Sequence, residues 1–188
     1  HYPSGPLRGY KSDAWEGGHR VPFMVRWPGN VKSGGVCDQL VHQADLIATI
    51  ADVLQVKLPD DAAEDSFSLM PLLEGGNEPV REHAISCSSQ GIPSLRQGNW
   101  KYIAASGSGG WSKGGDSSQS VQLYNLAEDL GETKNLAAEQ PERLAEMQAL
   151  LETLIRQGRS TPGKHQPNDV RVRRFPPPQQ SPAKAANS

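Results

Sequence analysis

A short segment near the start of the chain gathers residue types that could bind an anion. It runs from Leu7 to Arg20 and reads LRGYKSDAWEGGHR. Glycines let a backbone turn sharply or approach a ligand closely, and a lysine on such a loop presents a compact positive charge. Lys11 is therefore the first candidate for contact with an anionic substrate. Glu16 and Arg20, four residues apart, could brace the loop as an ion pair.

The same segment also fits a second interpretation, a loop that leads into a strand with its charges solvated. Glu16 and Arg20 suit a structural role better than chemistry, because each can satisfy the other. His19, His42 and His83 are isolated histidines, which are more often packed or exposed than catalytic. We name none of these residues as catalytic.

The residues that follow predict the elements that would hold this segment in place. Val21 to Trp27 is a mostly apolar run closed by Pro28-Gly29, which is typical of a core strand with helices on both sheet faces. Asp45 to Leu54 places apolar residues at helical spacing and predicts an amphipathic helix docked on that sheet. Ser66 to Leu73 is expected to be a compact apolar turn.

The second half of the chain predicts a small antiparallel sheet with one helix. A loop rich in Gly and Ser, Ser106 to Ser120, should be mobile between two of the strands. Pro141 begins a helix that ends at Gly158, and its apolar stripe should cover one face of the sheet. The expected strands are 84–88, 94–96, 100–104 and 121–126, and the stripe contains Leu144, Met147, Leu150, Leu151, Leu154 and Ile155.

Composition excludes some classes of partner. The formal net charge of −2 and the pI near 6.2 give no field that would gather nucleic acid or an anionic membrane surface. No apolar run approaches the roughly 20 residues that cross a bilayer. Cys37 and Cys87 have neither metal-ligand nor C-x-x-C spacing; one disulfide is possible, but we expect unpaired packing residues. The chain begins with His1 and lacks signal-peptide character there, so we expect an absent or processed N-terminus.

Three stretches resemble the sulfatase family. Residues 9–22, GYKSDAWEGGHRVP, are similar to its G-x-K, four residues, E-G-G-x-R-x-P signature. Residues 96–102, RQGNWKY, resemble its R-x-G-x-x-K-Y hairpin. Residues 123–136, LYNLAEDLGETKNL, resemble its L-Y-D-L-x-x-D-P-x-E-x-x-N-L segment. The resemblance covers about residues 7–154, with departures at Tyr10, Ser12 and Leu130.

The resemblance implies an α/β fold, the C-terminal part of an alkaline-phosphatase-like sulfatase with a small antiparallel sheet packed by a C-terminal helix. Residues 1–80 would end the catalytic α/β domain with the lysine loop, core strand and helix. Residues 81–158 would form the C-terminal subdomain with the small sheet, and 159–188, which are rich in Pro, Gln, Ser and Arg, a disordered tail. A strand at Val21 to Trp27 would then lack sheet neighbours in this chain.

The resemblance also implies which catalytic groups this chain contains and which lie upstream of it. Lys11 takes the family position whose ammonium contacts the sulfate oxygens, which makes it catalytic and substrate-binding, and His1 could also touch substrate. The family's nucleophile is a formylglycine made from a C/S-x-P-S-R motif beside a calcium ion. Neither Cys37 nor Cys87 fits that motif, so formylglycine and the calcium ligands are expected upstream of His1, with no metal site in this chain.

We therefore expect a hydrolase of sulfate esters in full-length form and an inactive fragment. Its partners would be a sulfated small molecule or carbohydrate and the missing N-terminal part of its own chain, with no nucleic acid and no membrane. The resemblance to this family favours a periplasmic or secreted location. The alternatives are a phosphodiesterase or phosphonate hydrolase of the same superfamily, and a noncatalytic binding remnant.

Overall fold

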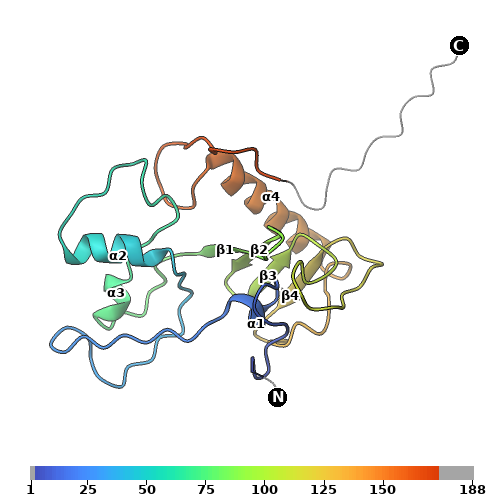
Figure 1. The fold of residues 1–188 in the computed structure, drawn as a ribbon, viewed down its shortest axis with the longest axis horizontal. Coiled ribbons are helices and arrows are strands. Elements are labelled where there is room, and N and C mark those ends of the chain that lie inside the picture. Colours follow the sequence, from blue (N-terminus) through green and yellow to red (C-terminus); the bar gives the residue numbers. More distant parts are fainter. Residues whose placement is uncertain (1–2, 174–188) are drawn as a thin grey trace, which may run out of the picture.

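A computed structural model describes residues 3–173 of the chain (Figure 1). A four-stranded antiparallel sheet lies at its centre, in the order β1-β2-β3-β4. The strands are β1 (His83–Cys87), β2 (Pro93–Gln97), β3 (Trp100–Ile103) and β4 (Gln122–Asn125), and the helices are α1 (Glu16–His19), α2 (Asp45–Val53), α3 (Met70–Leu73) and α4 (Pro141–Gln157). The predicted small sheet is confirmed. No helix of residues 3–173 has the length and hydropathy needed to cross a bilayer.

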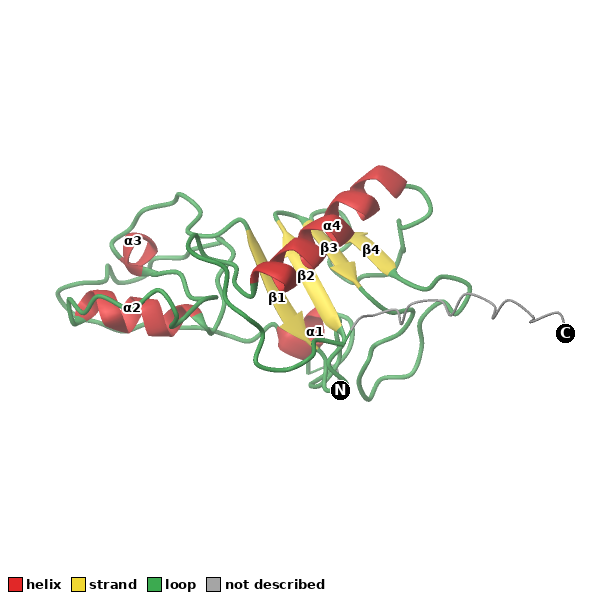
Figure 2. Ribbon diagram, turned by 90° about the horizontal axis from the view of Figure 1, so that it is seen from above, coloured by secondary structure: helices red, strands yellow, loops and turns green. Residues whose placement is uncertain are grey.

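The two faces of the sheet follow from the alternation of side chains along its strands. Leu95, Tyr102 and Leu123 are cross-strand neighbours in one row, and all three lie in a core with α4. Arg96, Lys101 and Tyr124 form the adjacent row and therefore point to the opposite face. This second face is covered by the segment around α1. Figure 2 shows α4 lying across the strands, with α1 at the other side of the sheet.

Helix α4 is built as its sequence predicts. Pro141 stands in the first turn, where its missing N–H costs no hydrogen bond, and Gly158 ends the helix at a φ of 65°. Gly158 donates hydrogen bonds from its N–H to the carbonyls of Leu154 and Ile155. Met147, Leu151 and Leu154 are buried against the sheet, with Leu144, Leu150 and Ile155 beside them, so the predicted stripe is confirmed.

The edge of the sheet formed by β4 is covered by hydrogen bonds from residues 135 and 136 rather than by another strand. Asn135 accepts a hydrogen bond from the N–H of Leu123 at 2.9 Å and donates one to the carbonyl of Val121 at 3.0 Å. Leu136 donates from its N–H to the carbonyl of Leu123 at 2.8 Å. These contacts satisfy backbone groups that an edge strand would otherwise present to another chain.

The helix predicted at Asp45 to Leu54 forms, but its expected docking on a sheet is wrong. Its buried residues are Asp45, Thr49 and Ala51, and its inner side meets residues 66–70 and α3 instead. The apolar side chains of Leu46, Ile47, Ile50 and Leu54 are 40 to 66% exposed. The physical reason is that the sheet it was predicted to cover, built on residues 21–27, does not form in the described chain.

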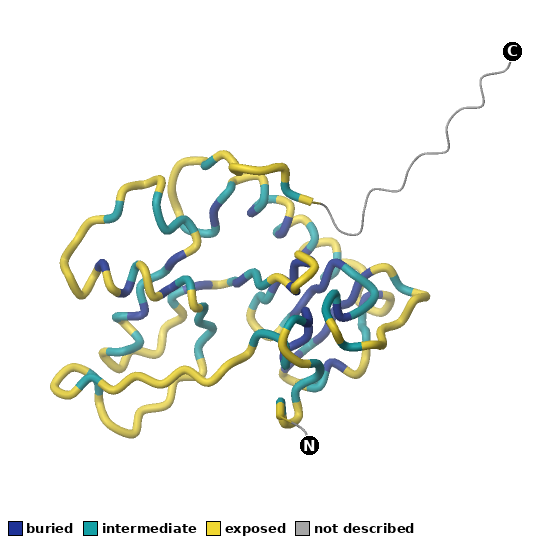
Figure 3. The backbone as a smooth tube through the Cα atoms, in the orientation of Figure 1, coloured by how far each residue is buried: buried dark blue, intermediate teal, exposed yellow. Residues whose placement is uncertain are grey.

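The core strand predicted at Val21 to Trp27 is also wrong for the described structure. These residues have no strand hydrogen bonding, and Val21, Phe23 and Met24 are 56, 49 and 88% exposed. Figure 3 shows the exposed course of this segment. A strand needs a neighbour to pair with, and the described chain brings none to this segment.

The first residues of the predicted tail pack against residues 60–65. Arg159 is buried, and it donates hydrogen bonds to the carbonyl of Asp60 at 2.9 Å and the hydroxyl of Thr161 at 2.9 Å. Ser160 donates to Asp65. The part of the predicted tail from 174 to 188 lies outside the described residues.

Candidate functional site: the lysine loop

Lys11 lies at the tip of a tight turn, which we call the lysine loop and define as residues 7–20. The N–H of Asp13 donates to the carbonyl of Tyr10 at 3.0 Å, and the N–H of Tyr10 donates to the Asp13 carboxylate at 2.8 Å. Ser12 has a φ of 92°, a conformation that is uncommon for a residue with a side chain. Lys11 is exposed and makes no hydrogen bond or ion pair with any residue in the described range 3–173. Its ammonium is thus free to meet a ligand.

Asp13 is the anchor beneath this tip. Its side chain is buried, and its carboxylate accepts hydrogen bonds from the N–H and the hydroxyl of Ser112 as well as from Tyr10. Burial alone would raise the pKa of Asp13, but the hydrogen bonds from Ser112 and Tyr10 lower the pKa below its ordinary value. The carboxylate therefore stays ionised and keeps Tyr10 and Ser112 together.

The two glycines after Glu16 allow the base of the loop to close. The N–H of Gly17 donates to the carbonyl of Arg8 at 2.8 Å. A Cβ at Gly17 would lie 2.3 Å from the carbonyl oxygen of Gly9, and one at Gly18 would lie 2.1 Å from that of Asp13. No side chain fits at such distances, so the E-G-G sequence is a requirement of backbone packing here.

A buried cluster of three charges joins the loop to the sheet. Lys101 on β3 is 1% exposed, and its ammonium lies 2.9 Å from a carboxylate oxygen of Glu16 and 2.9 Å from one of Glu132. The other oxygen of Glu132 accepts a hydrogen bond from the N–H of Glu16 at 2.6 Å. Buried charges are tolerated when they are paired and hydrogen-bonded in this way. Glu16, Lys101 and Glu132 come from the three separate motifs of the sequence, and they meet at one point.

The two carboxyl groups of this cluster have shifted pKa values of opposite sign. Burial raises the pKa of Glu132 and outweighs the charge of Lys101 and the hydrogen bond from Glu16. Burial also acts to raise the pKa of Glu16, but the hydrogen bond from His19 and the charge of Lys101 outweigh it and lower that pKa well below its ordinary value. Of the two carboxyl groups beside Lys101, Glu16 is the one that the surroundings favour in its charged form.

Further cations lie close to the buried carboxylate of Glu16 and to the loop that carries it. Arg20 lies 3.6 Å from its carboxylate, which confirms the predicted ion pair, and Arg96 on β2 lies 3.7 Å from it. Arg8 stacks on the ring of Trp15 at 3.8 Å and donates to the carbonyl of Glu132 at 2.6 Å. Side chains that precede Lys11 and side chains that follow it therefore both bind the loop to the sheet.

The sequence identified Lys11, Glu16 and Arg20 but missed the partners that hold them. Lys101 and Glu132 lie in recognised motifs, yet only the fold shows that they meet Glu16. The other predicted contact with substrate, His1, lies outside the described residues.

The remaining candidates do not join this site. Both cysteines are unpaired, as expected, but Cys37 and Cys87 are exposed, so their predicted role in packing is wrong. Among residues 3–173 no group of three or more His, Cys, Asp or Glu side chains is placed to hold a metal ion. The calcium ligands that the resemblance implies are expected upstream of His1, so the described residues do not test them.

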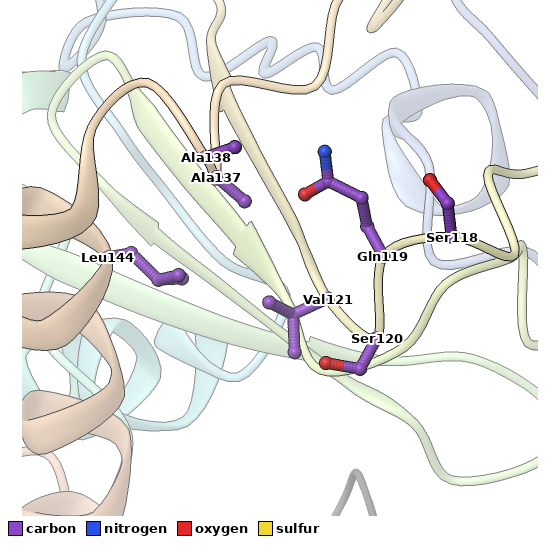
Figure 4. A pocket seen from close by; sticks show the side chains of 7 residues that line it. All are labelled: Ser118, Gln119, Ser120, Val121, Ala137, Ala138 and Leu144. Atoms are coloured by element: carbon purple, nitrogen blue, oxygen red, sulfur yellow. The ribbon is translucent and has the colours of Figure 1, made fainter.

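A surface pocket beside α4 is a poor candidate for chemistry. It is lined by Ser118, Gln119, Ser120, Val121, Ala137, Ala138 and Leu144, which lie around the mouth shown in Figure 4. None of these side chains is ionisable and none belongs to the lysine loop. The pocket thus offers neither a charge for a sulfate group nor an acid or base.

Comparison with known proteins points to one family. The sequence profile described as Sulfatase matches residues 1–56. An N-acetylgalactosamine-6-O-sulfatase from Bacteroides thetaiotaomicron is 37% identical over 160 residues, which cover 82% of this chain and 31% of that protein. Human arylsulfatase A is 32% identical over 149 residues, or 71% of this chain and 29% of that protein.

The fold gives the same result. A solved structure from work on the metabolism of multiple glycosaminoglycans by Bacteroides thetaiotaomicron matches with a TM-score of 0.70 and 34% identity. It covers 82% of this chain, and the chain covers 33% of it. The expectation of a C-terminal part of an alkaline-phosphatase-like sulfatase is confirmed, and the chain spans about a third of the length of these relatives. The chain belongs to the sulfatase family.

Proposed function

We propose that this chain supplies the sulfate-binding lysine of an enzyme that hydrolyses sulfate esters of carbohydrates. One observation carries the proposal: Lys11 stands exposed and unpaired among the described residues, on a loop whose base is held by the buried Glu16, Lys101 and Glu132 cluster. A fixed cation on a rigid support is what electrostatic stabilisation of a developing negative charge requires. The relatives named above act on sulfate esters, and this supports the substrate class.

In the proposed reaction a sulfate ester and water give an alcohol and sulfate. Negative charge gathers on the nonbridging and leaving oxygens as the S–O bond breaks, by analogy with phosphoryl transfer. The ammonium of Lys11 would donate hydrogen bonds to those oxygens and bind the transition state more tightly than the ground state. Glu16 and Lys101 would act as positioning residues that hold the loop.

We propose further that the complete enzyme carries its nucleophile and calcium ligands upstream of His1. The chain has no C/S-x-P-S-R sequence, and it spans 31% of the N-acetylgalactosamine-6-O-sulfatase. Calcium, when bound, would supply positive charge beside the sulfate group. Without a nucleophile most of the interactions that stabilise the transition state are missing. Residues 1–188 alone should therefore show only background hydrolysis.

The test is the Lys11→Ala variant of the complete enzyme, assayed with an aryl sulfate. We expect kcat to fall by roughly 10²-fold, the loss seen when one donor to a developing oxyanion is removed. Because Lys11 is exposed and has no partner in residues 3–173, the free energy of unfolding should change by less than about 0.5 kcal/mol.

The matched control is Lys32→Ala, which removes another exposed lysine from a loop. It should keep the wild-type turnover. Unchanged turnover in Lys11→Ala would remove the catalytic assignment. Faster hydrolysis of an aryl phosphodiester than of the aryl sulfate by the wild type would assign the enzyme to phosphorus chemistry instead.

A further inference from the structure

A second loop is built directly onto the lysine loop. Residues 106–115, which we call the Gly/Ser loop, leave the sheet after β3 and are closed by an isolated bridge between Gly107 and Gly115. The N–H of Ala14 donates to the carbonyl of Ser108 at 2.7 Å, and Trp111 donates from its N–H to the hydroxyl of Ser12 at 3.1 Å. The Gly/Ser loop, the first part of the segment Ser106 to Ser120 that was expected to be mobile, is thus fastened to the residues next to Lys11.

Glycine at position 110 makes this close approach possible. A Cβ at Gly110 would lie 2.4 Å from the carbonyl oxygen of Ser12 and 2.5 Å from the Asp13 carboxylate. The two backbones are therefore in contact, with no room for a side chain between them. The residue that follows, Trp111, is set beside the tip of the lysine loop by this contact.

Trp111 is unusual because its side chain is 74% exposed. Tryptophan is strongly buried on average, and a large exposed aromatic ring is typical of a binding surface. The Asp13 carboxylate joins the lysine loop to the Gly/Ser loop, since it accepts hydrogen bonds from the N–H of Tyr10 at 2.8 Å and from the N–H of Ser112 at 3.1 Å. Tyr10, which precedes Lys11, is itself 49% exposed. Tyr10 thus immediately precedes the candidate sulfate-binding lysine, and the backbone of Trp111 is hydrogen-bonded to Ser12, which immediately follows it.

We infer that Trp111 belongs to a second subsite, which holds the sugar unit next to the one that carries the sulfate ester. This inference rests on the proposed function of Lys11 and extends it to an oligosaccharide substrate. One face of a pyranose ring presents C–H groups, and an aromatic ring buries that apolar face without needing a charge. An aryl sulfate or a single sulfated sugar reaches Lys11 without a second unit and makes no use of the subsite.

The charge of the Gly/Ser loop agrees with this substrate class. Lys113 is exposed and stands two residues after Trp111. A sulfated oligosaccharide carries several negative groups, and a nearby cation attracts them across a distance comparable to the Debye length of about 8 Å at physiological salt. The aromatic ring would recognise the sugar, and the lysine would favour an anionic chain over a neutral one.

The test compares two substrates that carry the same sulfated sugar: N-acetylgalactosamine 6-sulfate, and a tetrasaccharide with that sugar at its non-reducing end. In the complete enzyme, Trp111→Ala should raise KM for the tetrasaccharide at least about tenfold, the loss expected for an aromatic anchor. The kinetic constants for the monosaccharide should stay within about twofold. Trp111→Phe should restore part of the affinity, because an aromatic ring is kept.

Ser117→Ala is the control, since Ser117 is exposed on the same segment between β3 and β4. It should behave as the wild type with both substrates. An equal loss with both substrates in Trp111→Ala, or no loss with either, overturns the subsite. If the enzyme hydrolyses neither saccharide, the proposed carbohydrate substrate class fails by itself, whereas the role of Lys11 is decided by the aryl sulfate assay. Calorimetric titration with the same tetrasaccharide then decides the subsite, and an equal Kd for wild type and Trp111→Ala overturns it.

Discussion

At the scale of single residues, the charges that support the site differ from the charge that would act in it. Lys11 is exposed and free, while Lys101 is 1% exposed and lies between Glu16 and Glu132. A buried ion pair adds little net stability over an apolar replacement of the whole set, but removing one member leaves an uncompensated buried charge. Lys101 is therefore a structural residue whose loss is felt at the lysine loop.

Lys101→Met should lower the free energy of unfolding by about 3–5 kcal/mol, because the carboxyl groups of Glu16 and Glu132 then lose the buried cation that lies between them. Chemical denaturation of the 188-residue chain measures the change. Lys134→Met is the control, since Lys134 pairs with Glu139 at 2.8 Å with both side chains more than half exposed, and it should cost no more than about 1 kcal/mol. Similar effects of the two substitutions would refute the role of burial.

At the scale of elements, the site is a junction of loops supported by one face of the small sheet. The face formed by the row of Arg96, Lys101 and Tyr124 receives the lysine loop, and the Gly/Ser loop then closes over the Asp13 side of it. Apart from the single turn of α1 and the isolated bridge between Gly107 and Gly115, neither loop has regular structure of its own. Their shape depends on hydrogen bonds to Asp13 and on glycines where the backbones touch.

The contact between the two loops should weaken in acid. The pKa of Asp13 is lowered in the folded state, so its stabilising effect is fully present above its ordinary value of 3.8 and is lost as the pH falls through the lowered pKa. Asp13→Asn should cost roughly 1–3 kcal/mol near neutral pH, and this difference from wild type should shrink as the pH falls below 3.8. Denaturation at a series of pH values measures it.

Asp61→Asn serves as the comparison, because Asp61 is exposed. Its unfolding free energy should follow that of the wild type at every pH. A constant difference between wild type and Asp13→Asn down to the lowest pH would show that the carboxylate charge does not hold the two loops together.

At the scale of the whole molecule, one part of the chain buries its apolar side chains and another part leaves them exposed. The sheet buries apolar side chains on both faces, whereas residues 21–25 and helix α2 leave theirs exposed. Contiguous apolar side chains on a protein surface mark contact surfaces. We propose that this surface packs against the rest of the complete sulfatase.

The 188-residue chain by itself should consequently self-associate through this surface. Ile50→Lys should reduce the association seen by sedimentation velocity without destabilising the sheet, because Ile50 is 56% exposed on α2. Val170→Lys changes another exposed apolar residue, 75% exposed beyond α4, and should leave association unchanged. A monomeric wild-type chain would contradict the proposal.

The sequence by itself determined the local elements and the family. The four short strand-like pieces, the stripe of α4, and its Pro141 and Gly158 boundaries all depend on neighbours along the chain, and all appear in the structure. The motifs around Lys11, Lys101 and Glu132 likewise identified the sulfatase family. These features are local because each is set by residues within a few positions of one another.

Only the tertiary structure decided what these elements meet. Residues 21–27 have a strand-like sequence, yet without a neighbouring strand their backbone has nothing to pair with. Glu16, Lys101 and Glu132 are far apart in sequence, and their ion pairs exist only because one sheet face and two loops converge. The place of Trp111 beside Lys11 depends in the same way on contacts between residues 12–14 and 108–112. Long-range contacts of this kind leave no periodic trace in the sequence, so folding in three dimensions fixes them.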